Sequence, residues 1–295
     1  MIDSFIFWNP DPVVFHLFSF PVRWYSLCWC VALIAGFLVM QHLYRKQKID
    51  DDVFVPLFMY CFIGVIIGAR LGHCLFYEPS YYLHHMVEML LPIRKIGDSW
   101  KLVGYEGLAS HGGAIGLFIA VWMYARKMGM SPLRVLDNMG IVAPISAAFI
   151  RLGNLVNSEI VGTPTQLPWG MIFAANGEGF PRHPAQLYEA IFYLLFFVVA
   201  WLLYRAIGEG SKRPGTGFFF GLCICVIFTF RFFIEFLKAD QVAAEETMWL
   251  NIGQLLSIPL AAVGIYCMAG GKWCKKFAEK PGAPIWRLPK ANKKK

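Results

Sequence analysis

An arginine, two asparagines and a glutamate lie close together at the end of an otherwise apolar stretch of the chain. The segment Phe149–Gly162 reads FIRLGNLVNSEIVG, and the run before it carries Arg134, Asp137 and Asn138 only near its start. A guanidinium keeps its charge in proteins and is costly to place in hydrocarbon. Arg151 therefore indicates a site that holds something anionic.

The polar residues of this segment have helical spacing. On an α-helix Arg151, Asn154 and Ser158 share one face, with Asn157 beside them. Guanidinium and amide groups together can surround phosphate or glycerol oxygens. The alternative is that they form hydrogen bonds between helices of a bundle.

The composition predicts that helices of an integral membrane protein position this site. Hydrophobic residues make up 57% of the chain and charged residues 16%, which is too apolar for a soluble protein. A helix needs about 20 apolar residues to cross about 30 Å of hydrocarbon. We expect an all-α membrane domain over residues 1–295, with an outside segment 1–24, a bundle over 25–269 and a basic cytoplasmic tail over 270–295. Its seven predicted spans are Tyr25–Tyr44, Val53–Tyr77, Gly107–Ala125, Leu133–Val156, Ala185–Tyr204, Thr216–Leu237 and Leu250–Ala269.

Lysine and arginine gather in alternate loops, which predicts the orientation. The loops at 45–48, 126–134 and 205–213 and the C-terminal tail are basic, whereas the intervening loops carry fewer basic residues. The N-terminus is then outside and the C-terminus cytoplasmic, and the outside loops 78–106 and 157–184 are long enough to form a small head. The net charge of +8 belongs mostly to the inner surface, where it meets membrane lipids. It gives no support for nucleic-acid binding.

Polar side chains from several spans lie at one predicted depth. At a rise of 1.5 Å per residue they fall within roughly 10 Å of the outer interface: Tyr25, Arg70, His111, Arg151, Glu189 and Arg231. Three arginines against few carboxylates give a surplus of positive charge, which predicts a site for a phospholipid phosphate. Asp137 lies toward the opposite side, where we expect a surface position.

Several of these residues have a structural alternative. Arg231 and Glu235 are four residues apart, so one can neutralise the other on a helix. Arg70 lies in a ridge of glycines that packs helices closely, and it can donate to backbone carbonyls instead. Two glycines follow His111 and allow a helix or a ligand to approach the backbone there. Its role, structural or catalytic, stays open.

The segment that leads back into the membrane after the second long loop adds polar groups. Asn157–Pro184 is rich in glycine and proline and predicts turns rather than helix. His183 lies at its end, and Gln186 and Glu189 follow closely. The eight cysteines lie mostly inside predicted spans without a zinc-like spacing. We expect buried apolar cysteines, no metal and no cofactor.

The segment Phe149–Gly162 resembles the signature of the prolipoprotein diacylglyceryl transferase family. Further blocks similar to the family occur in family order over nearly the whole chain: Val22–Tyr25, Gly68–Gly72, Ser110–Gly113, Arg182–Glu189 and Arg231–Phe236. The signature is specific, whereas the short blocks are weak alone. Ile227 stands where some relatives have a tyrosine, and Ser110 replaces the aromatic residue that usually precedes the histidine.

The resemblance implies a seven-helix enzyme of the bacterial cytoplasmic (inner) membrane with its active site near the outer leaflet. Such an enzyme moves the diacylglyceryl group of phosphatidylglycerol to the lipobox cysteine of a prolipoprotein signal peptide. The products are a thioether and glycerol phosphate, and the reaction is the first step of lipoprotein maturation. The family's important residues fall here on Tyr25, His111, Arg151, Asn154, Glu159, Gly162, Arg231 and Glu235.

The residue types suit this chemistry. A thiol has a pKa near about 8.5, so we assign His111 to accept its proton, although a thiol that is already ionised is an open alternative. Arg151 and Arg231 would hold the phosphate and stabilise the leaving group. The remaining polar candidates are counted with substrate binding: Tyr25, Arg70, Asn154, Glu159, Gly162, His183, Gln186, Glu189 and Glu235.

Two other classes of membrane protein compete with this interpretation. A transporter or flippase for an anionic solute would also use arginines within the membrane, but the inner halves of the spans are almost uncharged. An intramembrane protease lacks support, because neither GxSxG nor a pair of aspartates within the spans is present.

Overall fold

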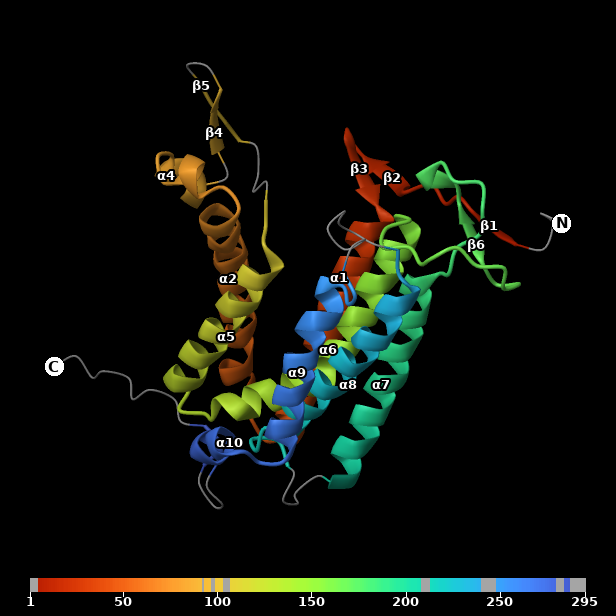
Figure 1. Ribbon diagram of the computed structural model, residues 1–295. Coiled ribbons are helices and arrows are strands. Elements are labelled where there is room, and N and C mark those ends of the chain that lie inside the picture. Colours follow the sequence, from red (N-terminus) through yellow and green to blue (C-terminus); the bar gives the residue numbers. More distant parts are fainter. Residues whose placement is uncertain are drawn as a thin grey trace. The chain divides into compact units, whose positions relative to one another are not determined.

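Long apolar helices make up most of the described chain, which covers residues 5–91, 93–96, 99–102, 107–207, 213–239, 248–279 and 284–286 (Figure 1). In this computed structural model five helices are long and apolar enough to cross a membrane: α1 (Trp24–Lys46), α2 (Asp51–Phe76), α6 (Pro132–Val156), α7 (Ala185–Ile207) and α8 (Phe218–Ile234) with the 3₁₀ turn η2 (Glu235–Leu237). A multi-pass membrane protein is therefore confirmed.

The other two predicted spans are helical but less suited to crossing. Helix α9 (Ile252–Met268) is apolar but has only 17 residues. Helix α5 (Ser110–Lys127) begins with Ser110 and His111 and ends with two basic residues, and it is not among the five. The count of seven spans and the orientation stay predictions, and parts of the loop 78–106 and of the tail 270–295 lie outside the described residues.

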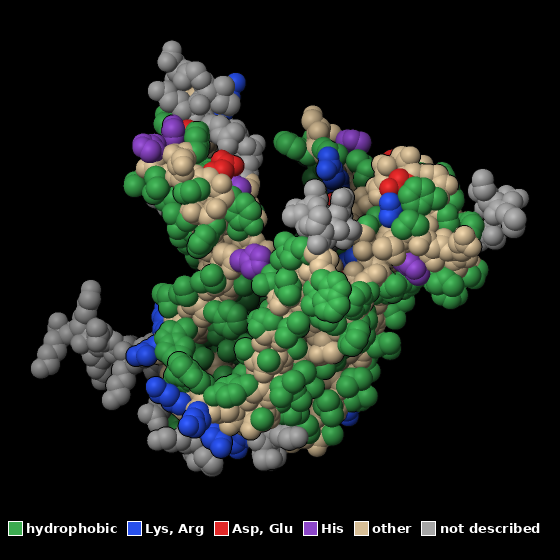
Figure 2. All heavy atoms as spheres, in the orientation of Figure 1, with side chains coloured by type: hydrophobic (Ala, Val, Ile, Leu, Met, Phe, Trp, Pro, Cys, Tyr) green, Lys and Arg blue, Asp and Glu red, His purple; other side chains and the backbone are tan. Residues whose placement is uncertain are grey.

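The chain forms two compact units, Met1–Leu43 with Leu136–Glu279 and Tyr44–Val135 with Lys280–Lys295. The first contains most of α1 and α6 together with α7, α8, α9 and α10 (Lys272–Phe277). On the face shown in Figure 2, hydrophobic side chains cover its long helices, whereas Lys and Arg gather around α10. Glycines let neighbouring helices approach, since a Cβ on Gly140 would lie 2.6 Å from the Phe219 carbonyl oxygen of α8.

Short strands precede α1 and follow α6, which the expected all-α class did not include. Strand β1 (Ile6–Trp8) pairs in parallel with β6 (Met171–Phe173), and β2 (Val13–Leu17) forms a hairpin with β3 (Phe20–Arg23). The Trp8 indole donates to the Leu155 carbonyl at 2.9 Å. Strands of three to five residues give too short an alternation to be recognised in a sequence. They tie the N-terminal segment to the end of α6.

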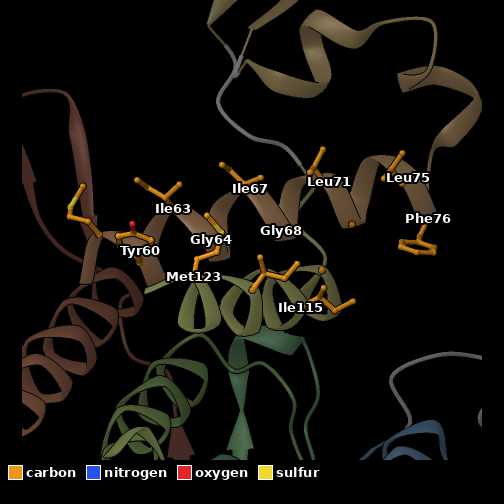
Figure 3. A pocket seen from close by; sticks show the side chains of 16 residues that line it. Tyr60, Ile63, Gly64, Ile67, Gly68, Leu71, Leu75, Phe76, Ile115 and Met123 are labelled. Atoms are coloured by element: carbon orange, nitrogen blue, oxygen red, sulfur yellow. The ribbon is translucent and has the colours of Figure 1, made fainter. Parts of the chain in front are cut away.

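In the second unit α2 and α5 pack along their glycines. Backbones meet where Gly68 and Gly72 approach Gly112, since a Cβ on Gly112 would lie 2.8 Å from Gly72 Cα. The two helices line a cavity of about 550 Å³, in which Figure 3 shows apolar side chains such as Ile67, Leu71 and Ile115. The unit also holds α3 (Pro79–Tyr82), α4 (Met86–Leu90) and the hairpin of β4 (Ile93–Ile96) and β5 (Ser99–Leu102).

Asp137 corrects one expectation, because it is fully buried rather than at the surface. Its carboxylate accepts backbone N–H bonds from the segment that starts α8: Gly215 at 2.8 Å, Thr216 at 3.0 Å, Gly217 at 2.8 Å and Phe220 at 2.9 Å. A carboxylate at the N-terminus of a helix satisfies donors that have no partner within the helix. Asp137 thereby fixes the start of the helix that carries Arg231.

Asp137→Asn is expected to lower the free energy of unfolding by about 1.5–3 kcal/mol, the range for hydrogen bonds to a charged group. The amide offers one acceptor oxygen and places an N–H₂ group among donors. Denaturation in detergent measures the effect. Asp50→Asn is the matched control, because Asp50 is exposed and its side chain caps no helix N–H. Equal losses in the two variants would contradict the role of Asp137.

Candidate active site

The end of α6 presents Arg151 and Asn154 beside an irregular turn. After Val156 the backbone leaves the helix, and Ser158 and Ile160 both adopt a φ of 56°. A positive φ is uncommon for residues other than glycine and is a true outlier for a β-branched one. Strain of this kind persists where the surroundings over-determine the conformation. The turn sends the chain toward Gly162.

Five charged side chains from α6, α7, α8 and the segment after α8 form one network, named here the charged network. Arg151 Nε lies 3.1 Å from Glu189 Oε2, and Arg231 Nε lies 3.4 Å from Glu235 Oε1. Lys238 Nζ lies 3.1 Å from Oε1 of each of these glutamates. The two arginines are thus connected through two carboxylates and one ammonium group.

Amide groups extend the charged network toward the turn after α6. Arg151 Nη1 donates to Asn154 Oδ1 at 3.4 Å, and Asn154 Nδ2 donates to Glu159 Oε2 at 3.1 Å. Asn157 Nδ2 donates to the other Glu159 oxygen at 2.9 Å. Gln186 on α7 donates to the Glu159 backbone carbonyl. The amide bonds of the polar face predicted for α6 thus stay within residues 151–159, and Gln186 attaches the turn to α7.

The site is closer to electrically neutral than the expected surplus of positive charge, because carboxylates pair with its arginines. Glu189 pairs with Arg151, Glu235 pairs with Arg231, and Glu159 bonds to the two asparagines. Arg151 keeps 18% of its side chain exposed and Arg231 keeps 40%, whereas Glu189 is fully buried. The guanidinium groups are therefore paired on one side and accessible on the other. The five groups of the charged network carry a net charge of +1, from three cations and two carboxylates.

Gly162 joins the turn after α6 to two other segments: the one that leads into α7 and the one that follows η2. Its N–H donates to the His183 carbonyl at 2.9 Å, and its carbonyl accepts from Arg182 Nη1 at 3.0 Å. Glu178 forms an ion pair with the same guanidinium, which lowers the pKa of that carboxyl through a side-chain hydrogen bond. The backbone at Gly162 also bridges to Lys238. Gly162 therefore links the backbone at His183 to the backbone at Lys238.

Tyr25 and His183, which were also predicted for the site, lie in the same unit as the charged network. The ring of Tyr25 packs on α6, because a Cβ on Gly153 would lie 3.0 Å from Tyr25 Cδ2. The His183 Nδ1 lies 3.2 Å from the Tyr188 hydroxyl, which accepts a bond from the Trp169 indole at 2.8 Å.

Arg70 and His111 belong to the other unit. Arg70 donates to the carbonyls of Glu88 at 2.6 Å and Met89 at 3.2 Å and lies over the Tyr82 ring. The alternative of a donor to backbone carbonyls is thus confirmed for Arg70, and the acceptors belong to α4. His111 is exposed at the start of α5, where α2 approaches the glycines that follow it. That these two residues lie beside Arg151 stays a prediction.

Lys238 and Asn251 are members of the site that the sequence interpretation missed. Lys238 falls one residue after the predicted span Thr216–Leu237 and thus in a loop, although it follows Glu235 by three positions, which is a helical spacing for an ion pair. Asn251 Nδ2 donates to Glu235 Oε2 at 3.4 Å, and Asn251 Oδ1 caps α9 by accepting from the Gln254 N–H at 2.8 Å. Across the described residues, three or more potential metal ligands (His, Cys, Asp or Glu) do not gather at any point.

The helices and the charged network define the class, a multi-pass helical membrane protein with paired arginines at a buried polar site. Comparison with known proteins then gives the family. The family model described as prolipoprotein diacylglyceryl transferase matches residues 12–269. The chain belongs to this family of transferases.

Curated relatives cover nearly the whole chain. It is 52% identical over 262 residues to the phosphatidylglycerol–prolipoprotein diacylglyceryl transferase of Bacteroides fragilis, covering 88% of this chain and 93% of that protein. The proteins of the same name from Porphyromonas gingivalis and Tolumonas auensis are 41% and 39% identical. These alignments cover 90% and 89% of this chain and 94% and 96% of the relatives.

Proposed function

We propose that this protein transfers the diacylglyceryl group of phosphatidylglycerol to the lipobox cysteine of a prolipoprotein. A sulfur–carbon bond forms as the bond between that carbon and the phosphate oxygen breaks, and glycerol phosphate leaves. The thiol proton passes to a base, to which we assign His111. Support comes from family membership and from the relatives, whose names specify both substrates.

The charged network supports this function because two guanidinium groups retain accessible surface beside buried carboxylates. Arg151 and Arg231 would bind the phosphate and stabilise charge on the departing glycerol phosphate. Their pairing with Glu189 and Glu235 holds the guanidinium groups in place before the lipid binds. Preorganised charge of this kind costs no reorganisation during the reaction.

Two buried polar atoms suit the glycerol part of the headgroup. Ser158 Oγ and Gln186 Oε1 find no hydrogen-bond partner among the described residues. Buried polar atoms are usually satisfied, and an exception calls for an explanation such as a ligand. The hydroxyls of a glycerol can donate to Gln186 Oε1 and accept from Ser158 Oγ. Tyr25 on α1 and Asn154 on α6 would orient the same headgroup.

The location follows from the same proposal. The enzyme would lie in the bacterial inner membrane with its N-terminus outside, so that the site opens near the outer leaflet. Arg70 is proposed to contribute to substrate binding.

Purified protein with labelled phosphatidylglycerol and a lipobox peptide tests the function. We expect the peptide to gain the mass of one diacylglyceryl group and glycerol phosphate to appear in equal amount. A peptide with serine in place of the lipobox cysteine is the control and should remain unmodified. Lipid that moves between vesicle leaflets while the peptide keeps its mass would instead indicate a flippase.

A further inference from the structure

Lys238 is more deeply buried than the two arginines to which it is connected. Its side chain is 2% exposed, compared with 18% for Arg151 and 40% for Arg231. Lysine is almost never fully buried unless it is paired. Its ammonium group lies 3.1 Å from one oxygen of Glu189 and 3.1 Å from one oxygen of Glu235. One lysine thus connects the carboxylate partner of each arginine.

The backbone fixes where this lysine lies. Thr163 N–H donates to the Leu237 carbonyl at 2.8 Å, and Ala239 N–H donates to the Val161 carbonyl at 3.1 Å. These two bonds flank Lys238 on both sides and attach its segment to the turn after α6. The ammonium group is therefore held between α7 and η2 rather than free to follow a ligand.

We infer that Lys238 is a positioning residue that keeps Arg151 and Arg231 available to the phosphate of the lipid. This inference rests on the proposed function. The Lys238 ammonium group already bonds to Glu189 and Glu235, so its effect on the arginines passes through these two carboxylates. Because it shares the negative charge of both glutamates, neither carboxylate is left with an arginine as its only cation.

Charge counting shows what the lysine changes. With Lys238 the charged network carries +1, which complements the single negative charge of a phosphodiester. Without it two arginines face two carboxylates and the net charge is zero. Fully buried Glu189 would then depend on Arg151 alone, because a buried charge without a partner is strongly unfavourable. The phosphate would have to compete with the glutamates for both guanidinium groups.

The test compares Lys238→Met with Lys238→Arg in the transfer assay, with phosphatidylglycerol varied. We expect the methionine variant to raise KM for the lipid at least tenfold with a smaller change in kcat, and the arginine variant to recover most of this loss. Lys275→Met is the matched control, because Lys275 is an exposed lysine of α10 in the same unit. A methionine variant that accumulates and keeps the parent KM would overturn the inference.

The same substitution made in a Glu235→Gln variant separates the inferred role of Lys238 from a general loss of folding. In Glu235→Gln, Arg231 has no glutamate to neutralise it, and without Lys238 the charged network still carries +1 from two arginines and Glu189. Adding Lys238→Met should therefore raise KM less than threefold over Glu235→Gln. A rise of tenfold or more in that background would overturn the inference, also where Lys238→Met alone does not accumulate. If the parent protein itself transferred no lipid, the proposed function would be refuted. The inference about Lys238 is judged separately, from the ratios of KM between active variants.

Discussion

Arg151→Gln is expected to lower kcat/KM for lipid transfer by about 10²–10³-fold, the range seen when one preorganised donor to developing charge is removed. Glutamine is uncharged, so it cannot hold the phosphate by an ion pair, and it cannot donate from two sides as a guanidinium does. The variant also removes the 3.1 Å contact to Glu189 and the bond to Asn154. The transfer assay with mass detection measures this loss.

Arg205→Gln is the matched control for Arg151→Gln. Arg205 lies exposed in the last turn of α7 in the same unit, so its loss removes the same charge away from the charged network. Thermal unfolding in detergent shows whether both variants are folded at the assay temperature. Activity of a folded Arg151→Gln variant within threefold of the parent would remove Arg151 from the proposed mechanism.

Patterns carried by neighbouring residues could be predicted from the sequence. The five long spans follow from apolar runs of sufficient length. The pair of Arg231 and Glu235 follows from a separation of four residues on one helix. The glycine ridge around Arg70 predicted the close approach of another helix, which α5 makes. In each case the residues that form the pattern lie within one segment.

Pairings between distant segments could not be predicted in the same way. Glu189 was expected among the polar residues of the site, but only the fold shows that it pairs with both Arg151 and Lys238. Asp137 was assigned to the surface because its partners follow 78 to 83 residues later. Lys238 was assigned to a loop because the predicted span ended one residue earlier. The surplus of positive charge was overestimated for the same reason, since Glu189 pairs with Arg151 from another segment, and the charged network keeps a net charge of only +1.

Gly162→Ala is expected to lower both transfer and stability, because three segments meet at this residue. A Cβ would lie 2.5 Å from His183 Cβ, 2.6 Å from the His183 carbonyl oxygen and 2.7 Å from the Leu237 carbonyl oxygen. Two of these neighbours are backbone atoms, so a side-chain rotation cannot relieve the overlap. Overpacking of this kind costs about 1–3 kcal/mol. The segments would have to separate, and Lys238 would move with them.

Transfer should fall further than stability, because a displacement of about 1 Å at a reacting site can cost about 10²-fold in rate. Gly179→Ala is the matched control, since Gly179 lies in the same loop and a Cβ there would meet nothing within 4 Å. Its kcat/KM and unfolding temperature should match those of the parent protein. If Gly162→Ala behaved like this control, the bridge between the turn and Lys238 would not hold the site together. If it lost stability but kept its rate, Gly162 would support the fold alone.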